Sequence, residues 1–155
     1  NSNGCDKIQF LISVNPGEPA KPIAKIASGG ELSRIMLAIQ TVLSAHDDLD
    51  TMIFDEVDTG ISGSAAQKVG LKLHEVSRYA QVICITHLAQ IACLADYHLL
   101  IQKQVTENKT YTQVIPLSKE AQIKEIARMI GGQAITPLLL QNAQEMIDSA
   151  KQLKS

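Results

Sequence analysis

The stretch Thr51-Met-Ile-Phe-Asp-Glu-Val-Asp58 decides the fold of this chain, because a short apolar run ends abruptly in acidic residues. An apolar run of this length, bounded by polar residues, is typical of a buried parallel strand. Adjacent carboxylates at such a strand end suit two tasks. Asp55 could hold Mg²⁺ through a bound water, and Glu56 could act as general base on an attacking water. The alternative is that these residues only start a solvated acidic loop. This alternative is disfavoured, because a buried strand end normally avoids two unpaired charges.

Strands and helices alternate on both sides of this stretch. We expect strands at 7–14, 51–54, 81–86, 97–102 and 110–117. We expect helices at 31–45, 64–79, 88–94 and 119–130, and a last one from 137 onward, with Ser118 and Thr136 as the N-caps of the last two. A turn is expected at 107–109, between the last two strands. The proline-rich segment 15–22 and the segment 57–63 are expected to be loops. The pattern predicts an α/β fold with a mainly parallel sheet flanked by helices, a β-hairpin and two C-terminal helices.

A second feature precedes the acidic strand. Ser28-Gly29-Gly30-Glu31 leads into the helix expected at 31–45, whose apolar residues recur at helical spacing. Two glycines let the backbone approach an anion closely, and a helix start directs free N–H groups and a positive dipole end toward it. Ser28 could add a hydroxyl donor. The alternative is that Ser28 and the glycines only cap the helix.

A third feature is His87, which follows the strand expected at 81–86. A histidine at a strand end can reach the edge of a phosphate, although a lone histidine is more often a structural cap. Zinc is a further alternative, because Cys84, His87, Cys93 and His98 are suitable ligand types close in sequence. Both cysteines lie in apolar surroundings, where buried structural thiols are common, so the zinc interpretation is disfavoured.

The composition describes an ordinary globular chain of 155 residues, with 45% apolar and 19% charged residues. The net charge of −2 gives no bulk attraction to nucleic acid. The 3 cysteines form no CxxC pair, which favours a reducing, cytoplasmic compartment. No apolar run approaches the roughly 20 residues of a membrane span, so we expect no membrane partner. The first residue is Asn1 rather than Met, which suggests a piece of a longer protein.

The three features occur in an order that resembles the C-terminal half of an ABC-type ATPase head. Ser28–Glu31 resemble its signature motif, Met52–Glu56 its Walker B strand, Asp58–Ser62 its D-loop and His87 its switch histidine. The acidic run at 55–58 is similar to the SMC-like branch of this family. Similarity to the bacterial DNA-repair members of that branch extends over the stretches 15–18, 27–34, 54–63, 86–88 and 125–132.

This resemblance implies specific roles. The signature residues that would grip the γ-phosphate of ATP on the opposite subunit are Ser28, Gly29, Gly30 and Glu31. Asp55 would help hold Mg²⁺, Glu56 would activate water, and His87 would sense the γ-phosphate. The residues that would cross the dimer interface are Asp58, Thr59, Gly60 and Ser62. The implied partners are a Walker A lobe, a second head and DNA, and catalysis would consist mostly of positioning and charge stabilisation.

Two parts of such a head do not occur in the sequence. None of its 9 glycines precedes a lysine, so the phosphate-binding loop GxxxxGK[ST] is missing, and there is no heptad coiled coil. We therefore expect residues 1–155 to be a single-domain fragment of the head that does not hydrolyse ATP alone. The alternative is a non-catalytic dimerisation module of the same fold, which would be expected to have lost Glu56 or His87.

Overall fold

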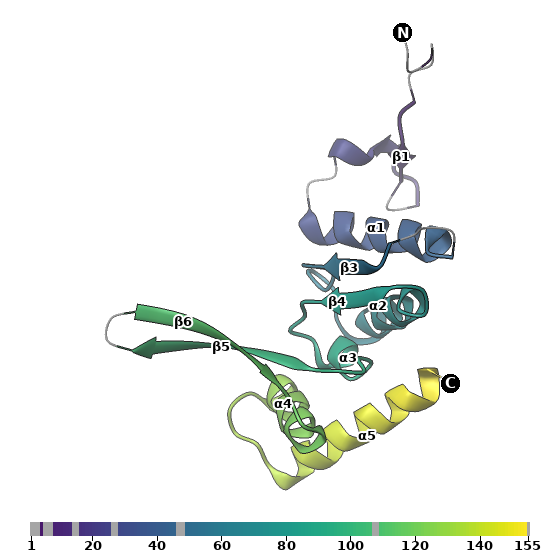
Figure 1. Ribbon diagram of the computed structural model, residues 1–155. Helices are drawn as coiled ribbons and strands as arrows, with labels where there is room; N and C mark the ends of the chain where they lie inside the picture. Colours follow the sequence, from purple (N-terminus) through teal and green to yellow (C-terminus); the bar gives the residue numbers. More distant parts are fainter. Residues whose placement is uncertain are drawn as a thin grey trace.

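The computed structural model describes residues 4, 8–13, 16–25, 28–45, 49–106 and 109–154. The helices are the single-turn η1 (Ile23–Lys25), α1 (Gly29–Leu43), α2 (Gly63–Val76), α3 (Ala89–Ala92), α4 (Lys119–Gly131) and α5 (Pro137–Lys154). The strands are β1 (Leu11–Ile12), β2 (Lys21–Pro22), β3 (Thr51–Phe54), β4 (Gln81–Cys84), β5 (Leu99–Thr106) and β6 (Lys109–Pro116). Helices and strands alternate through the middle of the chain, and a helix pair ends it (Figure 1).

The parallel sheet predicted from the sequence is present as the pair β3 and β4. Thr51 pairs with Gln81 and Phe54 with Cys84, and α2 makes the crossover between the two strands. The other pairs among the described strands, β1 with β2 and β5 with β6, are antiparallel. The sheet topology therefore places the ends of β3 and β4 side by side, where Asp55 and His87 follow them.

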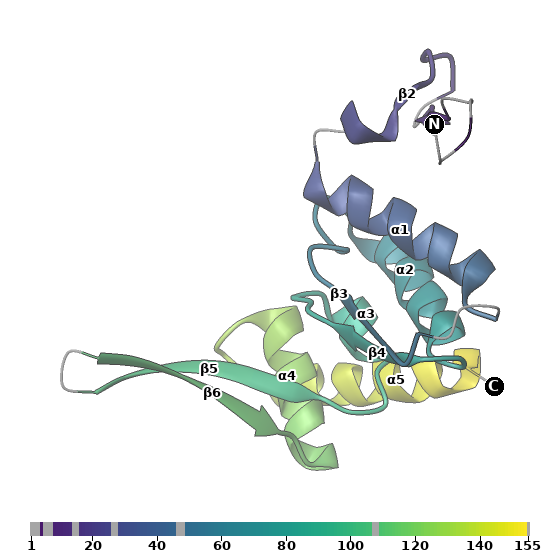
Figure 2. The ribbon, with the colours of Figure 1, turned by 45° about the horizontal axis from the view of Figure 1, so that its top comes forward.

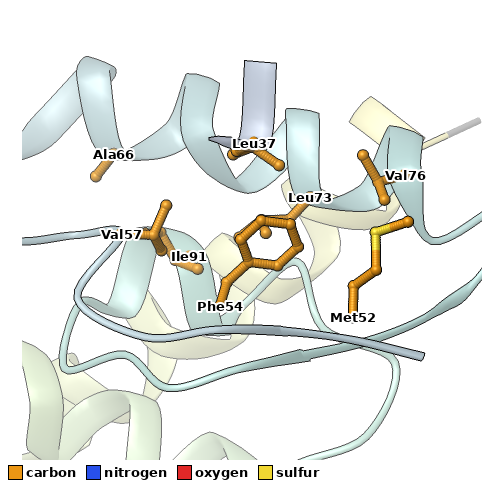
Figure 3. Packing of buried hydrophobic residues seen from close by; sticks show 8 residues of the cluster. All are labelled: Leu37, Met52, Phe54, Val57, Ala66, Leu73, Val76 and Ile91. Carbon is orange, nitrogen blue, oxygen red and sulfur yellow. The ribbon is translucent and has the colours of Figure 1, made fainter. Parts of the chain in front are cut away.

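The main core lies between this strand pair and two helices. Leu37 from α1, Leu73 from α2 and Phe54 from β3 are buried together there (Figure 3). β3 alternates between buried and exposed residues, and Ile53 is 67% exposed. The expected buried parallel strand is therefore buried on one face only among the described residues, because α1 and α2 cover that face.

α1 differs from its prediction in two ways. It begins at Gly29, so both glycines lie in its first turn rather than before it. The apolar face predicted for this helix is largely uncovered, because the helix packs on α2 through the side that carries Leu37. The exposed members of that face are Leu32, Met36, Ile39, Val42 and Leu43.

The N-terminal segment contains a short pair of strands. β1 pairs antiparallel with β2, with Leu11 opposite Pro22 and Ile12 opposite Lys21. The loop expected over 15–22 therefore ends in a strand, and the strand expected over 7–14 is reduced to Leu11–Ile12 among the residues described there. Residues 7, 14 and 15 lie outside the described part of the chain.

The C-terminal part combines a hairpin with two helices. β5 and β6 form a long hairpin that projects from the body of the molecule (Figure 2). The turn expected at 107–109 falls largely outside the described residues. Ile126 and Ala127 of α4 and Ala143 of α5 form a second core with Ala89. Within the described residues, no helix has the length and apolar character needed to cross a membrane.

The predicted caps of both C-terminal helices are confirmed. The Ser118 hydroxyl accepts a hydrogen bond from the Ala121 N–H, and the Thr136 hydroxyl accepts one from the Leu139 N–H. Pro137 is the first residue of α5, where its lack of an N–H costs nothing. Local chemistry alone therefore fixes where α4 and α5 start.

Candidate functional site

The loop that follows β3 is attached to the first turns of α1. The Ser33 hydroxyl donates a hydrogen bond to the Asp55 carbonyl at 2.8 Å. The Arg34 guanidinium donates from Nη1 to two further carbonyls, those of Val57 at 3.2 Å and Thr59 at 2.7 Å. The signature motif and the acidic loop, about 25 residues apart in sequence, thus form one unit.

Both signature glycines lie close to the acidic loop, and Gly30 is the more tightly constrained of the two. A Cβ atom added at Gly30 would lie 2.8 Å from the Thr59 carbonyl oxygen and 3.0 Å from that of Glu56. At Gly29 the added atom would collide with Oε2 of Glu56. The glycines therefore have a role within their own chain, in addition to the phosphate contact that the resemblance implies.

Glu56 has an unusual backbone conformation. Its φ is +58°, and it is the only non-glycine residue with positive φ in the part of the chain that the structure describes. The left-handed region costs an ordinary residue roughly 1–2 kcal/mol. Hydrogen bonds on both sides hold it there, from its N–H to Asp55 Oδ1 at 2.8 Å and from the Thr59 N–H to its carbonyl at 3.0 Å. Strain of this kind is found preferentially at functional sites.

Ser28 caps α1, as the structural alternative predicted. Its backbone is extended, and its hydroxyl oxygen accepts a hydrogen bond from the Glu31 N–H at 3.4 Å. The same hydroxyl keeps its proton for donation, so capping and phosphate binding are compatible. Glu31 lies in the first turn, where a carboxylate interacts favourably with the helix dipole. A phosphate contact by Ser28 and Glu31 stays a prediction.

Asp58 connects the acidic loop to the end of β4. Its side chain is almost fully buried, and one oxygen, Oδ2, accepts hydrogen bonds from the Thr86 hydroxyl at 2.6 Å and the His87 N–H at 2.9 Å. The Nδ1 atom of His87 lies 3.0 Å from the same oxygen. Burial raises the pKa of Asp58, but the hydrogen bonds from Thr86 and His87 and the charge of His87 outweigh it and hold that pKa below its ordinary value.

The rest of the loop assigned to the dimer interface is placed differently from Asp58. Thr59, Gly60 and Ser62 are exposed, so they are available to a second subunit. The Asp58 carboxylate is turned inward and bonded within its own chain. A contact across a dimer interface therefore stays a prediction for the three exposed residues.

The residues considered for zinc each have other partners. The His98 Nε2 atom lies 2.8 Å from the Ala92 carbonyl, and the Cys93 thiol donates to the Gln90 carbonyl. Burial, together with the charges of two nearby aspartates, raises the pKa of Cys84 to about 12, and burial also raises the pKa of Cys93. Zinc binds thiolates, so these thiols are poor ligands. Among the described residues, no group of three or more His, Cys, Asp or Glu side chains could hold a metal ion.

Sequence reasoning missed the roles of Ser33, Arg34 and Thr86. Ser33 and Arg34 follow the signature residues 28–31 closely, but their hydrogen bonds go to backbone carbonyls, which no side-chain pattern reveals. Thr86 precedes the predicted histidine, and its pairing with Asp58 spans 28 residues. The burial of Asp58 would have indicated a donor nearby, but this burial is visible only in the structure.

We expect Arg34→Ala to lower the free energy of unfolding by about 2 kcal/mol, because two carbonyls lose a charged donor. Chemical denaturation of the purified chain measures this change. The matched control is Arg78→Ala, which removes an exposed arginine and should change the free energy of unfolding by less than about 0.5 kcal/mol. Equal effects of the two substitutions would show that the Arg34 hydrogen bonds do not stabilise the loop.

The chain is similar in sequence to known DNA repair proteins. No protein-family model matches the chain. It is 51% identical over 98% of its length to the DNA repair protein RecN of Bacillus subtilis, and 48% identical over 95% to that of Vibrio cholerae. It covers 26% of each relative, so it spans about a quarter of their length.

A solved structure reported under "Structural biochemistry of ATP-driven dimerization and DNA stimulated activation of SMC ATPases" has a similar fold. The TM-score is 0.51 at 24% identity, over 80% of this chain and 81% of that one. The α/β fold predicted from the sequence is therefore confirmed, and it is similar to the fold of a solved SMC ATPase.

Proposed function

We propose that this chain supplies the signature and Walker B half of an ATPase head in a DNA repair protein. The proposal takes as its premise that the chain is a RecN-type segment with an SMC-type head fold. The observation that carries the proposal is the strained backbone of Glu56, which lies close to both signature glycines in space. Asp58, two residues later in the sequence, contacts His87. A bacterial cytoplasmic location at the nucleoid belongs to the same proposal.

The residues of this site have complementary chemistry for phosphoryl transfer. Glu56 polarises the attacking water, and His87, whose side chain is 75% exposed, contacts the γ-phosphate. Asp55 suits Mg²⁺, because this ion binds carboxylate oxygens and keeps several of its waters. One carboxylate together with the phosphate oxygens is therefore enough to hold the ion. The ion would supply charge neutralisation on the phosphates. The start of α1 at Ser28 and Gly29 would face the ATP of the opposite head.

A groove between α1 and β3 supports an association with a Walker A lobe. Leu32, Met36 and Ile53 line it and are exposed. The Gln40 Oε1 atom in the same groove is buried and has no hydrogen-bond partner among the described residues. An apolar groove with an unsatisfied polar atom suits contact with another protein surface. The uncovered face of α1 is explained if this lobe packs there in the complete protein.

DNA binding is assigned to the complete protein rather than to this segment. The net charge of −2 offers little attraction to phosphates, and the similar solved structure concerns SMC ATPases that DNA stimulates. We place the DNA contact outside these residues and expect two heads to associate when ATP is bound. The ATP-bound pair would then drive DNA binding or bridging.

Turnover of ATP by the chain alone and by the complete protein tests this proposal. We expect Mg²⁺-dependent hydrolysis by the complete protein and none by residues 1–155, because the sequence lacks the Walker A loop. Phosphate release measured with and without Mg²⁺ gives the result. A complete protein without turnover would favour the non-catalytic dimerisation module. Turnover by the chain alone, abolished by Glu56→Gln, would contradict the expected need for a Walker A lobe.

A further inference from the structure

One carboxylate oxygen collects three contacts at the end of β4. Oδ2 of Asp58 accepts from the Thr86 hydroxyl and the His87 N–H, and it lies 3.0 Å from His87 Nδ1. The Asp58 side chain is 4% exposed, whereas the His87 ring is 75% exposed. A buried anion thus holds one nitrogen of an imidazole whose ring is otherwise open to solvent.

The contact with Asp58 favours one position for the proton of the ring. A carboxylate only accepts hydrogen bonds, so the approach of His87 Nδ1 to within 3.0 Å of Asp58 Oδ2 favours a proton on Nδ1. In the neutral ring Nε2 is then an acceptor. When Nε2 also carries a proton it becomes a donor, and the Asp58 charge compensates the charge of the ring. A phosphate oxygen accepts hydrogen bonds, so only the doubly protonated ring can bind one through Nε2.

The aspartate is itself fixed from two sides. The Thr86 hydroxyl, which donates to Asp58, also accepts a hydrogen bond from the Leu88 N–H at 3.1 Å. The backbone on either side of Asp58 is held by Arg34, which bonds to the carbonyls of Val57 and Thr59. The orientation of His87 therefore depends on contacts that reach back to α1.

We propose that Asp58 is a positioning residue for His87. Asp58 sets the tautomer of the His87 ring, orients the ring and compensates its charge. The proposal rests on the phosphate-contacting role of His87 given above. It differs from a purely structural role for Asp58, which would stabilise the loop without changing the proton distribution of the ring. Outer partners that fix a metal-binding histidine in this way commonly contribute 10- to 100-fold to its function, and we expect an effect of the same order for Asp58 on the phosphate contact of His87.

The tautomer is measured directly by ¹⁵N NMR of histidine-labelled chain at a pH where the rings are neutral, with the His87 signals assigned from His87→Gln. We expect the Nδ1–H form in the wild type and in Asp58→Asn, whose amide oxygen still accepts, and a shift toward Nε2–H in Asp58→Ala. Circular dichroism confirms that each variant is folded. Asp96→Asn, an exposed aspartate paired with Lys154, is the matched control and should leave the tautomer unchanged. An Nε2–H wild type, or an unchanged tautomer in a folded Asp58→Ala, would overturn the proposal.

A double-mutant cycle on ATP turnover by the complete protein gives a second readout. We expect Asp58→Ala to lower kcat about 10- to 100-fold with a smaller change in KM, and to have no further effect when His87 is already Ala. Additive losses would mean that Asp58 acts independently of His87, which would overturn the proposal. A wild type without turnover would instead refute the proposed function, while the tautomer measurement would still decide the role of Asp58.

Discussion

Glu56→Gln in the complete protein should leave ATP binding intact and reduce hydrolysis by about 10²–10⁴-fold, the usual contribution of a general base. Gln keeps the size of the side chain but cannot accept the proton of an attacking water. Glu56 is exposed at the end of β3, so the substitution leaves the core unchanged. Phosphate release and binding of a labelled ATP measure the two effects separately.

The matched control for this experiment is Glu75→Gln. Glu75 is an exposed glutamate on α2 that pairs with Lys72, and its loss should leave turnover unchanged. Hydrolysis by Glu56→Gln at the wild-type rate would refute the role of Glu56 as general base. Loss of ATP binding in this variant would show that its carboxylate acts in binding instead.

Gly30→Ala should lower the free energy of unfolding of the chain by about 2 to 3 kcal/mol, in the range typical of overpacking. The added methyl group would meet the backbone carbonyls of Thr59 and Glu56, and Arg34 holds that loop in place, so the backbone has little room to move. Urea denaturation followed by circular dichroism measures the change.

Gly29→Ala is the informative control, because its methyl group would meet only the end of the exposed Glu56 side chain, which can rotate away. We expect the free energy of unfolding of this variant to stay within about 0.5 kcal/mol of the wild type. Equal stability of the two variants would mean that Gly30 does not approach the loop as closely as the structure indicates.

The sequence predicted those features that depend on neighbouring residues. The caps Ser118 and Thr136 and the strands β3 and β4 follow from local chemistry and apolar patterning. The sequence also placed Asp55 and His87 after two expected strands, which the structure shows to be paired and parallel. These predictions succeed because strand ends and helix starts have composition signals of their own.

Other features could not be predicted, since they depend on contacts distant in sequence. The burial of Asp58 follows from its pairing with Thr86, 28 residues away, and was not foreseen from its place in a loop. The exposure of Ile53 and Met36 has a different cause. Their apolar pattern suits a covered surface, and the described part of this chain holds nothing that covers it.

We infer that, in the complete protein, the signature motif of one subunit completes the ATP site of another. Ser28→Arg should block the contact by placing a bulky side chain at the start of α1, and Glu56→Gln should block the chemistry of the opposite site. Each variant of the complete protein should therefore be inactive alone. In a mixed dimer one site carries both substitutions, and the other carries neither.

The most direct test is the ATP turnover of an equimolar mixture of Ser28→Arg and Glu56→Gln after subunit exchange. Random pairing of subunits makes half the dimers mixed, each with one intact site, so we expect about a quarter of the wild-type rate. A mixture that is no more active than the two variants measured separately would contradict the claim that the sites are shared between subunits.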